Sequence, residues 1–357
     1  MRVAVVAYEP SRRTDRHGVD RQGVDRTEAV ARELSARGHE VLVFTPQFWH
    51  GADAGRTHRV DGVTYRRVDV APRIGSFVAR LPWMLARYRP DAVHATPAPP
   101  SAALAARAGA TLARAPLVLD WFGDEPLGEA RWIERAARSA SAVVAPSRFV
   151  ASRMETLGVP ADRTRVIPEW VDFETIESTP PADDAPDVVT GRSLDEAANL
   201  ESVFLALAEL RDRDWELAVV GDGPDRARYE QEAADLRIDD RVRFVGDASR
   251  ERRVALYRGA HVAVHTATRE FFPTELLWAL ACGCVGIVEY QKESSAHELV
   301  ERRERGFRVT TPEEVADAVV SAGDMPRKDV DEAFREFDRD AVLESWLDCY
   351  RGLGAGD

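Results

Sequence analysis

The sequence contains little lysine, little cysteine and no long apolar run. Only two of its 48 basic residues are lysines, Lys292 and Lys328. No run of about 18 apolar residues is present and strand-like residues open the chain, so we expect neither a membrane-spanning helix nor a signal peptide. Three cysteines cannot form a disulfide framework and indicate a reducing compartment, which predicts a cytoplasmic protein; they are Cys282, Cys284 and Cys349.

Two further absences concern metal ions. A single residue separates Cys282 from Cys284, whereas zinc ligands are usually two residues apart, so this pair indicates packing. The chain also has no Asp-x-Asp pair in a setting suited to a divalent cation. We therefore expect no metal site and no cofactor.

Charge is distributed unevenly along the 357 residues, whose net charge is −13. Residues 1–172 hold 25 basic and 20 acidic residues, and the remainder holds 23 basic and 41 acidic residues. This acid-rich, lysine-poor composition suits a halophile and describes solvation, and it does not indicate nucleic acid as a partner. The length suits two domains better than one core.

Short β-branched runs alternate with amphipathic helices along almost the whole chain, which predicts parallel sheets. The alternation stops at 173–187, a segment rich in Pro, Asp and Ser that we interpret as an interdomain linker, and then restarts. The predicted class is α/β, with two doubly wound Rossmann-like domains facing across a cleft. We assign 1–172 to the first domain, 188–328 to the second and 329–357 to a closing C-terminal helix.

The stretch 262–298 holds the strongest candidate site. An apolar strand, 262–265, is followed by Glu270 and by Pro273, which suits the first position of a helix that extends to Cys282. The first amides of such a helix lack internal partners and can hold a phosphate, while Glu270 beside them can hold a hydroxyl-rich group. This combination suits a nucleotide-sugar; the plainer alternative is an ordinary β–turn–α unit.

Glycine-containing turns follow two other predicted strands. Gly23 ends a polar loop and opens a helix that stops at Gly38, and Gly221 and Gly223 follow the strand 216–220. Both arrangements place backbone amides at the carboxyl edge of a parallel sheet, where anions bind. A tight turn before a helix gives the same pattern, and Gly221 and Gly223 more often serve the turn.

The first domain carries candidate residues for an acceptor. His94 lies near the end of the predicted strand 91–95. Asp120 ends the next strand and begins a polar and aromatic tip, where a hydroxylated acceptor could be held. The alternatives are a satisfied, half-buried histidine and ordinary turn chemistry. Helix 74–88 mixes arginines with Trp83, which indicates either peripheral contact with an anionic membrane or a packed helix with a solvated edge.

In this order and spacing, the motifs resemble those of the retaining family 4 glycosyltransferases, which share the two-domain GT-B fold. The resemblance covers nearly the whole chain. It implies that the N-terminal domain takes a glycan or lipid-linked acceptor and that the C-terminal domain takes a nucleotide-sugar donor. The motifs are Gly23-Val-Asp-Arg, Arg37-Gly-His-Glu-Val, Asp91-Ala-Val-His, Val166-Ile-Pro-Glu-Trp-Val-Asp, Val220-Gly-Asp-Gly-Pro, Arg241-Val-Arg-Phe-Val-Gly, Ala255-Leu-Tyr and Ala279-Leu-Ala-Cys-Gly.

The family signature is a pair of glutamates, and its first member matches Glu270, which by this resemblance holds donor sugar hydroxyls. The second position is Trp278 instead of the acid that would hold the ribose, and Glu275, nearly one helical turn earlier, is a candidate substitute. Trp278 is expected to pack in the core unless it stacks on the nucleobase. The implied donor-binding set is Gly23, Gly221, Gly223, Gly246, Phe271, Phe272, Thr274, Glu275 and Trp278.

The basic pair that holds the donor diphosphate in this family is matched in part. Arg192 matches the arginine, whereas the lysine position falls near Ala198. The second loop glycine is Pro273, and the usual acceptor-side histidine is replaced within 120–122. The resemblance implies front-face transfer with retention, in which the planar, charged fork of Arg192 stabilises the leaving diphosphate. Arg192 and Glu270 are thus the predicted catalytic residues; the alternatives are a surface ion pair and a solvated loop acid.

These departures from the family pattern keep two other functions open. One is a non-catalytic GT-B protein that binds a glycan or a partner subunit, which Trp278 and Ala198 motivate. The other is a GT-B sugar-nucleotide epimerase, which needs no acceptor.

Overall fold

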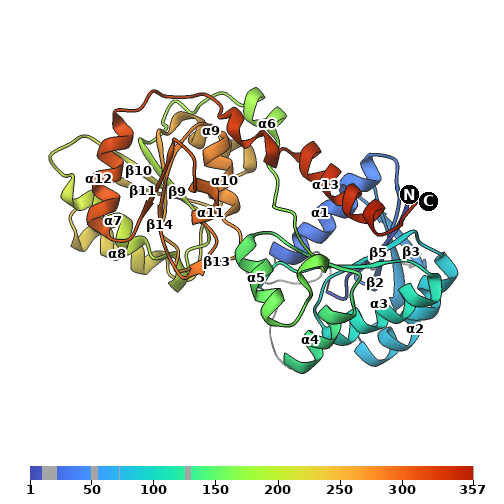
Figure 1. Ribbon diagram of the computed structural model, residues 1–357. Helices are drawn as coiled ribbons and strands as arrows, with labels where there is room; N and C mark the ends of the chain where they lie inside the picture. The colour runs from blue at the N-terminus through green and yellow to red at the C-terminus, as the bar shows by residue number, and fades with distance from the viewer. Residues whose placement is uncertain (10–21, 50–54, 72, 125–129, 357) are drawn as a thin grey trace. The chain divides into compact units, whose positions relative to one another are not determined.

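The computed structural model describes residues 1–9, 22–49, 55–71, 73–124 and 130–356 (Figure 1). The chain forms two compact units: unit 1 comprises Met1–Pro168 and Leu343–Asp357, and unit 2 comprises Glu169–Val342. Among the described residues, no helix has the length and hydropathy needed to span a membrane.

Unit 1 is built on an eight-stranded sheet in the order β3-β4-β2-β1-β5-β6-β7-β8. All neighbouring strands are parallel except β3 and β4. The central strands are short, apolar and buried, as expected where helices cover both faces of a parallel sheet. The strands are β1 (Arg2–Val6), β2 (Glu40–Pro46), β3 (Thr57–Val60), β4 (Val63–Asp69), β5 (Ala92–Ala95), β6 (Leu117–Asp120), β7 (Ala142–Ala145) and β8 (Thr164–Val166).

In the described part of unit 1, six α-helices accompany this sheet, with α2, α3 and α4 along one side in Figure 1 and α1 and α13 along the other. Ser147 caps α5 as its side chain accepts a hydrogen bond from the Val150 N–H at 3.3 Å. The serine thus satisfies one of the backbone N–H groups that the start of a helix leaves without an internal partner. The helices are α1 (Gln22–Ala36), α2 (Ile74–Tyr88), α3 (Pro100–Ala113), α4 (Ala130–Ser139), α5 (Arg148–Thr156) and α13 (Arg339–Gly352).

Unit 2 contains a six-stranded parallel sheet in the order β11-β10-β9-β12-β14-β16 and a separate two-stranded sheet, β13-β15. In Figure 1, α7, α8 and α12 cover one face of the larger sheet, and α9, α10 and α11 lie on the other. Doubly wound α/β architecture is therefore confirmed for both units. The strands are β9 (Val188–Gly191), β10 (Leu217–Val220), β11 (Val242–Gly246), β12 (Val262–His265), β13 (Arg269–Glu270), β14 (Val285–Glu289), β15 (Glu293–Ser294) and β16 (Gly306–Val309).

The helices of unit 2 follow the expected alternation, with one addition. The segment 173–187, interpreted above as a linker, begins with a short helix, α6. Asp172 caps this helix, accepting from the Glu174 N–H at 3.1 Å, and Phe173 and Ile176 are buried. Six residues are too few to show periodicity in sequence. The helices are α6 (Phe173–Ser178), α7 (Leu200–Glu209), α8 (Arg226–Asp235), α9 (Arg250–Gly259), α10 (Thr274–Ala281), α11 (His297–Val300) and α12 (Pro312–Gly323).

The C-terminal segment differs from the prediction of one closing helix. A 3-10 helix, Glu332–Phe337, precedes α13, and Asp338 between them has extended backbone (φ −64°, ψ 146°). The Asp338 carboxylate accepts a hydrogen bond from the Phe173 N–H at 3.2 Å, which favours the break at this residue. From Leu343 onward, α13 belongs to unit 1, where Trp346 and Tyr350 are fully buried. The last residues therefore complete the first unit.

Candidate functional site

Arg192 and Glu270 come together at the carboxyl edge of the sheet in unit 2. Arg192 follows β9 and Glu270 follows β12, and these two strands are parallel neighbours. The carboxyl ends of such strands lie at the same edge of the sheet, where ligands bind in this class of fold. Arg192 Nη1 lies 3.6 Å from Glu270 Oε2, and the two side chains are only 7% and 6% exposed.

The guanidinium of Arg192 is fixed by its own loop. Its Nε donates to the Ser193 carbonyl at 3.0 Å, Nη1 to the Ala197 carbonyl at 3.2 Å, and Nη2 to Asp195 Oδ1 at 3.1 Å. The expected alternative of a surface ion pair does not describe this side chain, because it is buried. The loop holds the cation in one orientation.

Glu270 is a buried acid with unused hydrogen-bonding capacity. Its Oε1 has no hydrogen-bond partner, and His265 Nε2, which also lacks one, lies 3.9 Å from Oε2. Burial raises the pKa of Glu270 to about 7, although the charge of Arg192 opposes this change. Burial also lowers the pKa of His265 to about 3, so this imidazole is neutral. The alternative of a solvated loop acid is wrong for Glu270.

The loop that carries Glu270 is held by the two-stranded sheet. β13 contains Glu270 itself and pairs with β15. The Ser295 N–H donates to the Glu270 carbonyl at 2.8 Å, and Ser295 Oγ donates to the Phe271 carbonyl at 2.7 Å. Sequence reasoning missed this clamp because two-residue strands carry no periodic signal.

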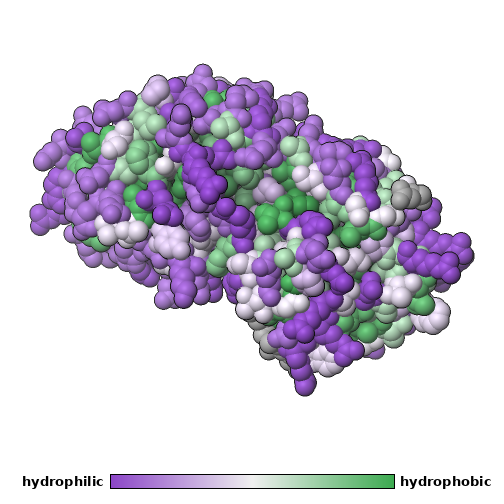
Figure 2. Space-filling view, viewed as in Figure 1, coloured by the Kyte–Doolittle hydropathy of each residue, from purple (hydrophilic) through white to green (hydrophobic). Residues whose placement is uncertain are grey.

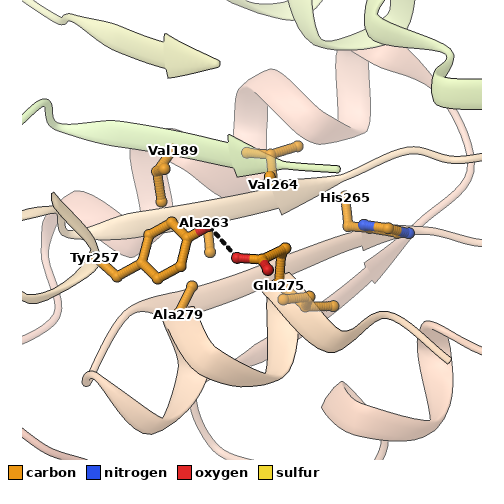
Figure 3. A pocket seen from close by; sticks show the side chains of 9 residues that line it. Val189, Tyr257, Ala263, Val264, His265, Glu275 and Ala279 are labelled. Carbon is orange, nitrogen blue, oxygen red and sulfur yellow. Dashed lines mark hydrogen bonds between the residues drawn. The ribbon is translucent and has the colours of Figure 1, made fainter. Parts of the chain in front are cut away.

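Glu275, the candidate substitute for the missing signature acid, is already engaged within unit 2. Its Oε1 accepts from Arg250 Nη1 at 3.1 Å and from Arg253 Nη1 at 2.6 Å. Its Oε2 accepts from the Tyr257 hydroxyl at 2.7 Å, and Figure 3 shows the two side chains pointing toward each other from α10 and α9. Glu275 therefore ties α10 to α9, and a ribose would have to compete with three donors.

Trp278 packs as a core residue. It is 6% exposed, and the guanidinium carbon of Arg250 lies 4.5 Å from the centre of its ring.

The small cavity in Figure 3, beside Tyr257 and Glu275, has a volume of only about 10 Å³. A single water molecule needs about that much space. This cavity does not hold a nucleotide.

Gly221 and Gly223 position the loop of Arg192. Gly221 has φ +124°, and a Cβ at this residue would lie 2.0 Å from the Arg192 carbonyl oxygen. A Cβ at Gly223 would lie 2.3 Å from the Leu194 carbonyl oxygen. Both glycines thus permit a close approach of two backbones, which is the turn-serving role. The Gly221 N–H donates to the Gly246 carbonyl at 3.1 Å. Gly246, also predicted to bind the donor, therefore contacts the same turn.

The start of α10 differs slightly from expectation. Pro273 is the residue before the helix, not its first residue, which is Thr274. The Thr274 N–H donates to the Phe272 carbonyl at 3.0 Å, so this amide is not free for a phosphate. Phe271 and Phe272 are 7% and 3% exposed and anchor the loop in the core.

His94 and Asp120 lie in a buried polar network of unit 1. They are 0% and 1% exposed, so the prediction that they touch an acceptor is not supported, and His94 is not half-buried. Arg26 Nε donates to Asp120 Oδ1 at 3.0 Å, and Thr27 Oγ1 donates to Asp120 Oδ2 at 3.2 Å. His94 Nδ1 and the Tyr350 hydroxyl are 2.7 Å apart. This network joins α1, β5, β6 and α13.

The charge on Asp120 is maintained by its partners. Burial alone would raise the pKa of its carboxyl, but Arg26, His94 and Thr27 together hold that pKa below the usual value. The ring of Trp346 lies 5.2 Å from the Arg26 guanidinium carbon. Asp120 is therefore a structural anion.

The predicted donor-binding residue Gly23 lies in the first turn of α1. The loop 10–21 before it lies outside the described residues.

The chain was compared with known proteins. Residues 24–175 match the model of Glycosyltransferase Family 4, and residues 172–337 match that of Glycosyl transferases group 1. No curated protein sequence matches the chain.

Several solved structures share the fold over essentially the whole chain. A glycosyltransferase from Rickettsia africae has 16% identity and a TM-score of 0.77, with 100% of both chains covered. The Anabaena protein HepE in complex with UDP has 18% identity and a TM-score of 0.76, with 99% of this chain and 100% of that chain covered. Sucrose-phosphate synthase from Thermosynechococcus elongatus has 18% identity and a TM-score of 0.74, with 99% of each chain covered. The two family models and this shared architecture identify the chain as a glycosyltransferase with the two-domain GT-B fold.

Proposed function

We propose that the protein is a retaining glycosyltransferase that moves a sugar from a nucleotide-diphosphate sugar to a lipid-linked or glycan acceptor. The observation that carries this proposal is the approach of Arg192 and Glu270 to 3.6 Å at the carboxyl edge of one sheet. Arg192 would stabilise the leaving diphosphate, and Glu270 would hold hydroxyls of the donor sugar. An Anabaena protein of the same fold was solved with UDP-glucose, which supports a nucleotide-sugar as donor.

The chemistry requires charge stabilisation at two places. As the bond to the anomeric carbon breaks, negative charge grows on the diphosphate and positive charge on the sugar. A guanidinium held by three hydrogen bonds meets the first demand without reorganising. The unpartnered Oε1 of Glu270 can accept from a sugar hydroxyl, which would satisfy a buried oxygen that otherwise has no partner.

The test is transfer of a radiolabelled sugar from a panel of nucleotide-sugars, with wild type and Glu270→Gln compared. We expect loss of one such interaction to lower kcat/KM by about 100-fold. Glu230→Gln is the matched control, since Glu230 forms an exposed pair with Arg226 on α8. Equal turnover by wild type and Glu270→Gln would remove Glu270 from the mechanism.

Two observations favour the second candidate, a non-catalytic protein of this fold. Glu275 is occupied by Arg250, Arg253 and Tyr257, and Ala198 replaces the phosphate-binding lysine. Calorimetry with UDP- and GDP-sugars separates the two candidates. Absence of binding by any nucleotide-sugar would favour the non-catalytic protein.

We further propose that the enzyme works at the cytoplasmic face of a membrane, docked through α2 and α3. Residues 70–119 contain six arginines and a single acid, Asp91, in a chain with a net charge of −13. Trp83 on α2 is 71% exposed and Leu112 on α3 is 53% exposed. Figure 2 shows hydrophobic and hydrophilic residues side by side over this part of unit 1. The arginines are Arg73, Arg80, Arg87, Arg89, Arg107 and Arg114.

The two helices pack closely enough to present one surface. A Cβ added at Gly109 of α3 would lie 2.6 Å from Leu85 Cδ1 and 3.0 Å from Pro82 Cα of α2. Trp83 and Leu112 are within three residues of this crossing. An exposed tryptophan flanked by Arg87 and by Arg80, whose partner Asp69 is largely buried, suits the interface of an anionic bilayer. Such a location would favour a lipid-linked acceptor.

Sedimentation with vesicles tests this surface. We expect binding to vesicles of mixed phosphatidylcholine and phosphatidylglycerol and none to phosphatidylcholine alone. Trp83→Ala and Arg87→Ala should each weaken binding about fivefold, the equivalent of about 1 kcal/mol per group at the surface. Tyr290→Ala removes an aromatic side chain that is 45% exposed in unit 2, and it should leave vesicle binding unchanged. Equal binding by all variants would reject docking through α2 and α3.

A further inference from the structure

A second pocket lies at the opposite edge of the sheet in unit 2. It has a volume of about 250 Å³ and adjoins Gly306, the first residue of β16. The pocket is also lined by Arg305, which donates to the carbonyl of Gly283, and Gly283 precedes β14. The pocket is therefore at the amino ends of these strands, whereas Arg192 and Glu270 follow the carboxyl ends of β9 and β12.

Arg305 gives this pocket a buried positive charge. The residue is 8% exposed; Nη1 donates to the Pro326 carbonyl at 2.7 Å and Nη2 to the Gly283 carbonyl at 2.8 Å. Its Nε is buried without a hydrogen-bond acceptor, and no carboxylate of the described residues pairs with it. Two carbonyl dipoles do not neutralise a full charge, and a buried ion without a counter-ion is costly.

The other charged residues of the pocket leave a positive excess. Lys328 pairs with Asp331 at 3.1 Å, and Arg303 pairs with Glu336 at 2.7 Å. Arg302 also lines the pocket, is exposed, and forms no ion pair within the part of the chain that the structure describes. The exposed Glu304 is the remaining acid of the lining. Within the described residues, the guanidinium groups of Arg302 and Arg305 thus form no ion pair, in a half of the chain that is otherwise strongly acidic.

The remaining walls are apolar. Leu280 from α10, Val300 from α11 and Phe334 line the pocket, and all three are buried. Phe334 is covered on one side by the Arg303 guanidinium carbon at 4.0 Å from the ring centre. A guanidinium fork matches phosphate oxygens, and apolar walls of this size suit a small organic group.

We propose that this pocket binds a phosphate monoester of a small organic molecule. The phosphate contacts the guanidinium groups of Arg302 and Arg305, and the organic part lies against Leu280, Val300 and Phe334. Binding supplies the counter-charge that Arg305 lacks in the protein alone. This site is independent of the proposed sugar transfer.

Calorimetry at constant ionic strength tests the proposal, with phenyl phosphate and inorganic phosphate as probes. We expect saturable binding of phenyl phosphate that is at least about tenfold tighter than that of inorganic phosphate, because the phenyl ring buries apolar surface. Arg302→Ala should weaken phenyl phosphate binding about tenfold, the equivalent of one hydrogen bond to a charged group. Arg302 is exposed, so this variant does not threaten the fold.

Two further variants make the outcome decisive. Arg308→Ala removes an exposed arginine that lies on β16 and does not line the pocket, and it should leave binding unchanged. Arg305→Gln should abolish binding, with its unfolding temperature measured alongside. Absence of saturable binding, equal affinity for the two probes, or unchanged affinity in Arg302→Ala would each overturn the proposal.

Discussion

Glu270 and His265 approach each other at the carboxyl edge of the sheet in unit 2, where Glu270 Oε2 lies 3.9 Å from His265 Nε2. Neither His265 Nε2 nor the other carboxylate oxygen, Glu270 Oε1, has a hydrogen-bond partner. The pair is buried, and the pKa of Glu270 is raised to about 7. Its carboxyl group therefore changes charge within the physiological range. Both the activity and the stability of the protein should reflect this titration.

The first prediction concerns activity. Because the transition state is cation-like at the sugar, ionised Glu270 stabilises it better than the neutral acid, so kcat/KM should rise with pH through about 7. Glu270→Gln should lose this rise as well as most of the activity. The measurement is kcat/KM against pH with the best donor found. A rise of equal size in the variant would assign the titration to another group.

The second prediction concerns the same group and stability. The pKa of Glu270 is raised above its usual value of 4.5, so the folded state binds more protons than the unfolded state between about pH 4.5 and 7. The protonated form contributes up to about 3 kcal/mol to the free energy of unfolding, and this contribution is lost as pH rises through about 7. The free energy of unfolding of Glu270→Gln, measured with urea, should increase relative to that of wild type from pH 5 to pH 8. A constant difference would mean that Glu270 does not titrate there.

The third prediction concerns the link between α9 and α10. Glu275→Gln removes the charge that pairs Arg250 and Arg253, whose side chains are 34% and 28% exposed. We expect the free energy of unfolding to fall by about 2 kcal/mol, which is less than the loss for fully buried pairs. Tyr257→Phe removes only one hydrogen bond to Glu275 and should cost about 1.5 kcal/mol. Additive effects in the double variant would contradict a shared network, which predicts less than the sum.

The fourth prediction concerns unit 1. Asp120→Asn removes the carboxylate that pairs with the buried guanidinium of Arg26, and it should cost about 3–5 kcal/mol in the free energy of unfolding. The pKa of Asp120 is lowered, so its contribution is present at neutral pH and is lost as pH falls below the usual carboxyl range. Asp184→Asn, at an exposed pair with Arg243 and Arg252, should change stability little. Similar small effects for both variants would deny Asp120 its structural role.

The fifth prediction concerns the backbone next to Arg192. Gly221→Ala places a Cβ 2.0 Å from the Arg192 carbonyl oxygen at a positive φ. It should therefore displace the Arg192 loop and cost about 2 kcal/mol or more, with loss of transfer. Gly323→Ala, in α12 with open space around it, should be neutral or stabilise by about 0.5 kcal/mol. Calorimetric unfolding temperatures of the two variants test this contrast.

The order of most elements could be predicted from the sequence because short β-branched runs alternate with amphipathic helices. The helix 74–88 was predicted with the bounds it has in the structure. The meeting of Arg192 and Glu270 also follows from topology, since residues after adjacent parallel strands share an edge. The break at Asp338 depends on a contact with Phe173 far away in sequence, so local pattern does not reveal it.

The partners of the site residues could not be predicted, because they come from tertiary packing. Nothing in the sequence around Glu275 indicates that Arg250, Arg253 and Tyr257 of another helix would occupy its carboxylate. In the same way, His94 and Asp120 stand at strand ends, where sites form. Their burial became apparent only once Arg26 and Tyr350 were seen beside them.

The return of α13 to unit 1 sets an order of events during synthesis. The ribosome makes β1 to β8 first, yet the partners that Trp346 and Tyr350 supply to Arg26 and His94 emerge only after all of unit 2 has been translated. The first unit to be made is therefore the last to complete its core. A released chain that ends at residue 342 should therefore expose this part of unit 1 to chaperones and proteases, although all of unit 2 is present.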